Sequence, residues 1–115
     1  MGETIVKIKV SSIKNINWQD VEALVDTGAT YTTIPSKILE VLQVTKSRKI
    51  DIEFANGKVE PRYLGDVYLE VEGIRVPNQV IFGEENDAIV LGLITLESCG
   101  LTVDTVNKKL VPLQK

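Results

Sequence analysis

The stretch ALVDTGATYTTIP, Ala23 to Pro35, decides the fold that we expect for this chain. An apolar strand runs directly into Asp26, and Thr27, Gly28 and Ala29 follow it. Because glycine has no Cβ, backbone N–H groups can approach the carboxylate of a neighbouring aspartate closely. The pattern therefore predicts a carboxylate at the floor of a cleft, held by a tight loop at the end of a strand.

The composition is that of one compact domain, which we expect to cover residues 1–115. Of the 115 residues, 43% are hydrophobic and 25% are charged. The chain contains no apolar run of about 18 residues, and polar residues alternate with apolar ones at its start, where a signal peptide needs an apolar segment. Its single cysteine, Cys99, cannot form an internal disulfide. We therefore expect a cytoplasmic protein without a membrane partner.

Charge and residue usage exclude several classes of function. The net charge is −3 and the 13 basic residues are scattered, which argues against nucleic acid as a partner. The chain has no histidine, so the usual general base of serine and cysteine hydrolases and the commonest zinc ligand are both missing. No glycine-rich phosphate-binding motif is present. We therefore expect carboxylate chemistry that needs no metal and no cofactor.

Alternating apolar residues and turn signals predict about eight or nine short strands that close into a β-rich barrel. The dipeptides Asn56-Gly57 and Glu72-Gly73 are predicted to turn two consecutive hairpins, and Pro77 indicates an edge strand or a bulge. The remaining strands are expected at residues 4–10, 18–25, 32–35, 88–91, 101–106 and 110–113.

Two short helices are also predicted. The first has Ser36 as its N-cap, and the second covers residues 93–99 and stops at Gly100. Their apolar faces are expected to be formed by Ile38, Val41, Leu42, Leu93 and Leu96.

A single Asp-Thr-Gly motif supplies only half of a proton-sharing pair of carboxylates. Amide hydrolysis needs a base to activate water and an acid to polarise the carbonyl, and two neighbouring carboxyl groups that share one proton provide both. Asp104-Thr105 is not a second copy, because Val106 stands where the loop needs glycine. The second carboxylate is therefore expected from a two-fold related copy of the same chain.

The sequence resembles the retroviral-type aspartic proteases, the retropepsins, and their cellular and prokaryotic relatives. VDTGAT is similar to the catalytic motif of that family, and IVLG, Ile89 to Gly92, is similar to its second hallmark. The resemblance implies an all-β fold: a closed acid-protease barrel with one or two short helices that is functional as a homodimer. It implies Asp26 as the catalytic aspartate, and as the supporting residues of the catalytic loop Thr27, Gly28, Ala29, Thr30 and Gly92.

The resemblance also implies a flap, a mobile hairpin that closes over an extended peptide substrate, at residues 50–63. Its tip would be Asn56 and Gly57, although a purely structural hairpin is an equal alternative for this turn. The residues implied to line the flap and the substrate pockets are Leu24, Thr33, Ile34, Phe54, Ala55, Asn56 and Gly57.

Viral members of the family carry Asp-Asp and Arg, an ion pair near the dimer interface, where this chain has Thr30, Tyr31 and Leu93. The expected function is an aspartic endopeptidase whose dimer lacks that ion pair. One alternative is a dimeric peptide-binding or scaffolding module of the same fold with weak or lost activity. Another is a small β-barrel with unrelated ligand chemistry.

Three features outside the motifs have simpler interpretations. Cys99 is expected to be a small buried residue, and Trp18 to belong to the core or to a dimer surface. Residues 46–49 are expected to form a solvated turn.

Overall fold

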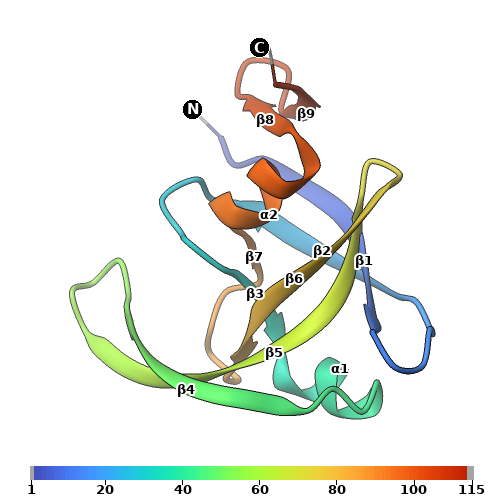
Figure 1. The fold of residues 1–115 in the computed structure, drawn as a ribbon. Helices are drawn as coiled ribbons and strands as arrows, with labels where there is room; N and C mark the ends of the chain where they lie inside the picture. Colours follow the sequence, from blue (N-terminus) through green and yellow to red (C-terminus); the bar gives the residue numbers. More distant parts are fainter. Residues whose placement is uncertain (1, 114–115) are drawn as a thin grey trace.

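The computed structural model describes residues 2–113, which form nine strands and two short helices (Figure 1). The elements in chain order are β1 (Ile5–Ser12), β2 (Gln19–Val25), β3 (Thr32–Pro35), α1 (Ser36–Val41), β4 (Lys46–Glu53), β5 (Val59–Val71), β6 (Ile74–Gly83), β7 (Val90–Leu91), α2 (Leu93–Cys99), β8 (Leu101–Asp104) and β9 (Lys109–Pro112).

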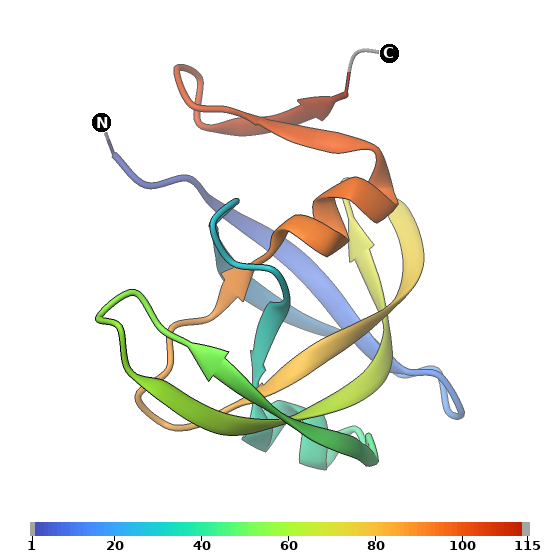
Figure 2. The same ribbon diagram turned by 60° about the vertical axis from the view of Figure 1, so that its left-hand side comes forward.

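Seven strands form one sheet in the order β1-β2-β7-β3-β6-β5-β4, and an additional pairing of β1 with β5 closes it into a barrel. Strand β4 lies outside the closed ring and pairs with β5 alone. Most neighbours are antiparallel, but β2 pairs with β7 and β3 pairs with β6 in parallel. The expected all-β barrel with two short helices is therefore confirmed, and Figure 2 shows it from a second side.

Period-2 alternation places the core inside this barrel. In β1, Ile8 and Val10 are buried while Lys7 and Lys9 are exposed, and Ile8 faces Val21 of β2. Side chains from every strand of the closed ring and from both helices meet in one hydrophobic cluster. Cys99 belongs to this cluster, as expected, and its burial raises the pKa of its thiol.

Both predicted hairpins form, but the strand that they share is continuous. Strand β5 runs through Gly65 without a break, and a Cβ there would lie 2.6 Å from the Phe82 ring. Glycine at this position leaves room for a large core side chain. Pro77 pairs with Tyr68 of β5, while β3 pairs with β6 only from Val80 onwards. Pro77 therefore lies on an open edge, as predicted.

The ends and faces of the helices differ from the predictions. Pro35, not Ser36, is the N-cap of α1, and its side chain cannot accept a hydrogen bond. Val41 is 76% exposed, whereas Leu39 is completely buried. The short helix leaves β3 in a direction that turns Leu39 towards the barrel, and a helical pattern of six residues does not fix that direction.

Two further predictions are wrong. Leu93, at the start of α2, is 39% exposed, because the barrel faces Leu96 instead. Residues 46–49 are not a turn but the start of β4, where Lys46 pairs with Gly65 of β5. The ammonium groups of Lys46 and Lys49 lie over the Tyr63 ring, at 4.8 and 5.2 Å from its centroid, so this ring supports an otherwise solvated strand.

Strands β8 and β9 form a separate two-stranded sheet after α2. Figures 1 and 2 show this sheet at one end of the molecule, beyond the barrel. The turn between its strands is held by the carboxylate of Asp104, which accepts hydrogen bonds from Asn107 and Val106, and these bonds lower the pKa of Asp104. Neither helix of residues 2–113 is long and apolar enough to cross a membrane.

Candidate active site

Parallel pairing between β2 and β7 places Asp26 at the mouth of the barrel. Leu24 pairs with Val90 and Val25 pairs with Leu91. The next residue, Asp26, continues this ladder, because its N–H donates to the carbonyl oxygen of Leu91 at 3.0 Å. The backbone of Asp26 is therefore held by the end of the sheet, while its side chain lies just beyond it.

A tight turn then holds the carboxylate itself. The N–H of Gly28 donates to Oδ1 of Asp26 at 2.9 Å, and the N–H of Ala29 donates to the Asp26 carbonyl at 3.1 Å. A Cβ on Gly28 would lie 3.2 Å from the same carboxylate oxygen, which is why the turn favours glycine. The side chain of Asp26 is exposed in the single chain.

The loop after Asp26 is bonded to the first turn of α2. The N–H of Leu93 donates to the carbonyl of Ala29 at 2.8 Å, and the N–H of Ile94 donates to the carbonyl of Thr30 at 3.1 Å. The first N–H groups of a helix lack partners within the helix, so this loop satisfies two of them. The exposed side chain of Leu93 consequently lies beside the loop that carries Asp26.

Gly92, at the end of the IVLG motif, bonds to the segment that follows the VDTGAT motif. Its N–H donates to Oγ1 of Thr32 at 3.0 Å, and that hydroxyl is 2.6 Å from Oγ1 of Thr95 in α2. Both threonines are buried. A Cβ on Gly92 would lie 2.5 Å from the carbonyl of Tyr31, so the chains pass too closely for any side chain. These contacts make the region beneath Asp26 a closely packed platform.

The Asp26 side chain lines an open cleft with a volume of about 320 Å³. The cleft brings together the start of the chain, the end of β2 and the β8–β9 sheet. Its lining residues are Gly2, Glu3, Thr4, Leu24, Val25, Asp26, Thr27, Val103 and Thr105. The sequence did not suggest the contributions from residues 2–4, 103 and 105, because they meet Asp26 only in the folded chain.

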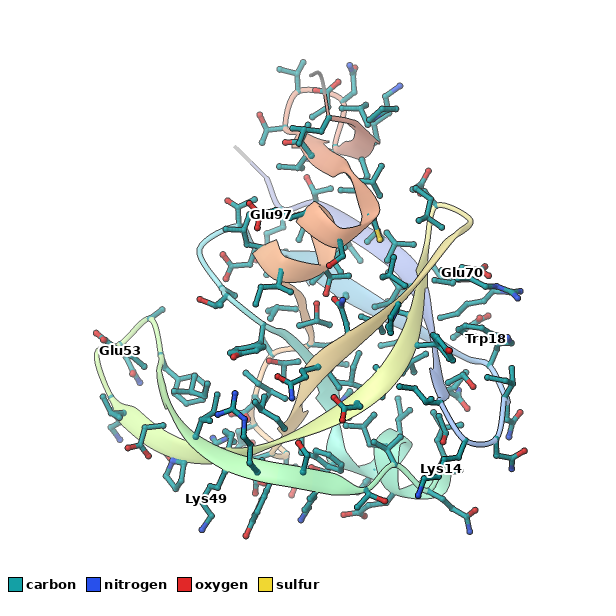
Figure 3. The ribbon with its side chains drawn as sticks, in the orientation of Figure 1. Lys14, Trp18, Lys49, Glu53, Glu70 and Glu97 are labelled. Carbon is teal, nitrogen blue, oxygen red and sulfur yellow. The ribbon has the colours of Figure 1, made fainter. Side chains whose placement is uncertain are left out.

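The β4–β5 hairpin lies where the resemblance implies a flap, and we call it the flap from here on. It projects from the barrel on the same side as the loop after β2 in Figures 1 and 2, and Figure 3 shows Glu53 near its end. At its tip the N–H of Phe54 donates to the carbonyl of Lys58 and the N–H of Gly57 donates to the carbonyl of Phe54, each at 2.8 Å. Gly57 has φ +85°, a conformation that glycine adopts at little cost.

The proposed pocket residues fall into two groups. Leu24 is half-buried and lines the Asp26 cleft, while Phe54 is half-buried at the flap and Ala55, Asn56 and Gly57 are exposed at its tip. Thr33 is buried, and Ile34 is 0% exposed within the core, which argues against contact between Ile34 and a substrate. The side chain of Ile34 belongs to the core cluster inside the barrel.

Sequence reasoning missed a buried ion pair between the flap and the loop before β7. Arg62 of β5 donates from Nε to Oδ2 of Asp87 at 2.8 Å and from Nη2 to Oδ1 at 3.0 Å. The hydrogen bonds from Arg62 hold the pKa of Asp87 below its ordinary value, and the same bonds raise the pKa of Arg62. One signal in the sequence could have revealed this ion pair. Arg62 stands two residues before the apolar Leu64, and in a strand that spacing places both side chains on the inward face.

No group of three or more Cys, Asp and Glu side chains that could hold a metal ion is found among residues 2–113. The chemistry that the described residues offer at the site is that of the Asp26 carboxylate and of the backbone groups that surround it.

Comparison with known proteins identifies the family of the chain. The family model described as "gag-polyprotein putative aspartyl protease" matches residues 14–98, which include both Asp26 and Gly92. The fold is that of the retropepsin-like aspartic proteases. The chain belongs to the family of gag-polyprotein aspartyl proteases.

Solved structures support the same fold. The EIAV protease complexed with the inhibitor HBY-793 superposes with a TM-score of 0.61 at 18% identity, over 96% of this chain and 93% of that one. The solution structure of Simian Foamy Virus (mac) protease gives a TM-score of 0.55 at 20% identity, over 80% and 92% of the two chains. A sequence search of curated proteins returns no significant match.

Proposed function

We propose that this protein is a homodimeric aspartic endopeptidase that cleaves polypeptide substrates between its two Asp26 carboxylates. The observation that carries the proposal is the geometry of Asp26. Its backbone is held by Leu91 and its carboxylate by the N–H of Gly28, yet the side chain is exposed at an open cleft. A carboxylate that is held in place and exposed can face the same carboxylate of a second copy across a two-fold axis.

Two carboxyl groups about 3 Å apart share one proton, because like charges at that distance cannot both persist. The ionised group takes a proton from a water molecule held between them, and the water oxygen bonds to the scissile carbonyl carbon. The protonated group gives its proton to the carbonyl oxygen. Collapse of the tetrahedral gem-diol then breaks the C–N bond. The departing amine takes the proton that the first carboxylate accepted from water, and a hydroxyl of the intermediate gives its proton to the other carboxylate, so the pair again holds one proton.

The exposed surface around the site supports dimer formation. Leu93 is 39% exposed beside the catalytic loop, and Thr27 is exposed next to Asp26. A second copy that covers this face would bury the apolar side chain and enclose the carboxylates. The flap on the same side would close over a substrate that lies as an added strand.

The direct test is peptide cleavage by the wild-type protein and by Asp26→Asn at acidic to neutral pH. We expect Asp26→Asn to lose activity by about 10³-fold or more, because the amide cannot act as a base. Asp104→Asn is the matched control, since Asp104 also precedes a threonine but holds only the β8–β9 turn. Equal cleavage by Asp26→Asn and the wild type would refute the proposed function.

Dimer formation has a separate signature. If each subunit supplies half of the site, activity falls faster than linearly as the protein is diluted. Strict proportionality between rate and protein concentration down to nanomolar enzyme would contradict a weak dimer. Sedimentation measured over the same concentrations relates the loss of activity to dissociation.

One observation favours a second candidate, a dimeric peptide-binding or scaffolding module with weak or lost activity. Thr30, Tyr31 and Leu93 occupy the places where viral relatives carry an ion pair, and Leu93 makes only a backbone hydrogen bond to the loop. Binding of a peptide-like transition-state inhibitor separates the two candidates. An endopeptidase needs Asp26 for that binding, whereas a scaffold binds ordinary peptides equally well with Asp26→Asn.

We also propose that the protein acts in the cytoplasm. The support is the single cysteine, Cys99, which is buried and can take part in no internal disulfide. Fractionation of cells that express the protein would test this location.

A further inference from the structure

Arg62 occupies an unusual position for a charged residue. Its cross-strand neighbour in β4 is the half-buried Ile50, and the next inward position of β5 is the buried Leu64. The arginine side chain is only 9% exposed. A guanidinium is rarely buried unless it is paired, since removal of its charge from water is costly.

The environment of Arg62 satisfies this requirement mainly through Asp87. Asp87, whose side chain is 11% exposed, accepts two parallel hydrogen bonds from the guanidinium, the geometry that makes such pairs strong and directional. Nη1 of Arg62 donates to the carbonyl of Pro61 at 2.9 Å and lies 3.6 Å from Glu60. The guanidinium also lies over the Phe54 ring, 5.0 Å from its centroid.

Asp87 connects this cluster to the catalytic platform. Its carboxylate accepts the N–H of Glu84 at 2.8 Å, and its own N–H donates to the Glu84 carbonyl, so the turn that carries it is closed. Two residues later, the carbonyl of Ile89 accepts the N–H of Leu24, and β7 follows at once. A rigid connection therefore runs from the base of the flap to the strand that supports Asp26.

We propose that Arg62 and Asp87 are positioning residues that fasten the base of the flap to the loop before β7 and confine flap movement to the tip. This inference rests on the proposed function and deepens it. With the pair intact, only the last ladder pairs, Ile52 with Glu60 and Glu53 with Val59, and the turn beyond them can open. These residues are half-buried or exposed, which is typical of segments with low local stability.

Without the pair, the whole hairpin would move relative to Asp26. A substrate would then have to order a longer segment when it binds, and this ordering opposes binding. The chemistry at Asp26 would change less, because the platform contacts of Gly92 and Thr32 do not involve the flap. The expected kinetic signature is a raised KM with a smaller change in kcat.

The test compares Arg62→Gln and Asp87→Asn with Arg75→Gln. Arg75 is a matched control, since it also donates to a carboxylate, Glu70, at 2.6 Å and stacks on an aromatic ring, Trp18, at 4.8 Å. Figure 3 shows Trp18 and Glu70 on the opposite side of the molecule from Glu53 of the flap. The first measurement is amide hydrogen exchange of the free protein, which requires no substrate.

We expect exchange at the amides of the flap base, in residues 48–51 and 63–64, to become about tenfold faster or more in both flap variants, while the tip amides of Phe54, Gly57 and Lys58, which open with the pair intact, change less. Exchange in the β8–β9 sheet should stay at the wild-type rate, and Arg75→Gln should match the wild type throughout. For peptide cleavage, we expect KM to rise about tenfold and kcat to change by less than about threefold.

The double variant Arg62→Gln with Asp87→Asn covers the case in which a single variant fails to fold, because it leaves no unpaired buried charge. It should show the same fast exchange at the amides of the flap base. Wild-type exchange at the flap base in folded variants would overturn the proposal, and so would an equal increase in the flap base and in the β8–β9 sheet. An inactive wild-type protein would refute the endopeptidase, while the exchange rates would still decide the role of Arg62 and Asp87.

Discussion

The platform that supports Asp26 and the β4–β5 flap on the same side of the molecule (Figures 1 and 2) are built in opposite ways. The platform is held by backbone hydrogen bonds between the catalytic loop, β7 and α2, and by the buried hydroxyls of Thr32 and Thr95. The flap is a single hairpin that β4 extends beyond the closed barrel, and one ion pair fastens its base. If the protein is the endopeptidase proposed above, such a construction would keep the reacting carboxylate still and let the hairpin over it move.

The platform and the flap each need a glycine, but for different reasons. Gly92 has an ordinary φ of −91°, but the backbone of Tyr31 leaves no space for a Cβ. A Cβ on Gly57 would meet no atom within 4 Å, but the φ of this residue is +85°. Close packing requires glycine in the platform, whereas turn geometry favours it in the flap. Substitutions that separate these two reasons therefore test the comparison.

The largest effect is expected from Gly92→Ala. The new Cβ would lie 2.5 Å from the backbone of Tyr31 and 2.9 Å from the amide nitrogen of Thr32, and backbone atoms in a barrel wall cannot move aside cheaply. We expect a loss of about 3 kcal/mol or more in the free energy of unfolding, measured by urea denaturation, together with loss of activity. A wild-type stability for Gly92→Ala would show that the platform is less closely packed than the structure indicates.

A smaller loss is expected when the buried hydroxyl pair is broken. Thr95→Val keeps the shape of the side chain but removes the partner of Thr32, whose Oγ1 also accepts the N–H of Gly92. We expect unfolding to require about 1–3 kcal/mol less free energy, because a buried polar group loses its hydrogen bond. Thr45→Val, at an exposed position, is the control and should lie within about 0.5 kcal/mol of the wild type. Equal effects would mean that the hydroxyl pair contributes nothing specific.

The platform was more predictable from sequence than the flap attachment. Asp26 and Gly28 lie in one short motif, so the turn and its position at a strand end followed from the sequence, whereas Gly92 was identified through the family resemblance because the backbone that excludes its Cβ belongs to a distant segment. Strand alternation and the turns at Asn56-Gly57 and Glu72-Gly73 likewise led to the barrel. These features depend on contacts that are local or strictly periodic.

The remaining features depend on contacts between distant segments. Arg62 and Asp87 are separated by 25 residues, and neither belongs to a motif. The exposure of Val41 and the burial of Leu39 depend on the direction in which α1 leaves β3, and the continuity of β5 at Gly65 depends on a ring from β6. The sequence of a single segment does not reveal these contacts, because they form only when distant segments pack together in the closed barrel.

The flap glycine gives the next prediction. Gly57→Ala meets no neighbouring atom, so its cost is limited to the left-handed backbone conformation. We expect a loss of about 1 kcal/mol in unfolding free energy at most, well below that of Gly92→Ala. Urea denaturation of the two alanine variants side by side makes the comparison direct. If Gly57→Ala proved the more damaging of the two, the assignment of rigid platform and loosely held flap would be reversed.

The smallest effect concerns the pH dependence of the flap attachment. Hydrogen bonds from Arg62 lower the pKa of Asp87 in the folded protein, so the folded state binds a proton at Asp87 less readily than the unfolded chain does. The resulting stability is fully present above the unfolded pKa, about 3.9, and is lost as the pH falls through the lower folded pKa.

We expect the stability difference between the wild type and Asp87→Asn to be constant above about pH 5 and to shrink by about 1 kcal/mol or less towards about pH 2. Urea denaturation at a series of pH values measures it. If this difference in unfolding free energy stays constant down to about pH 2, the charge of Asp87 does not stabilise the flap attachment, and only the packing of its side chain does.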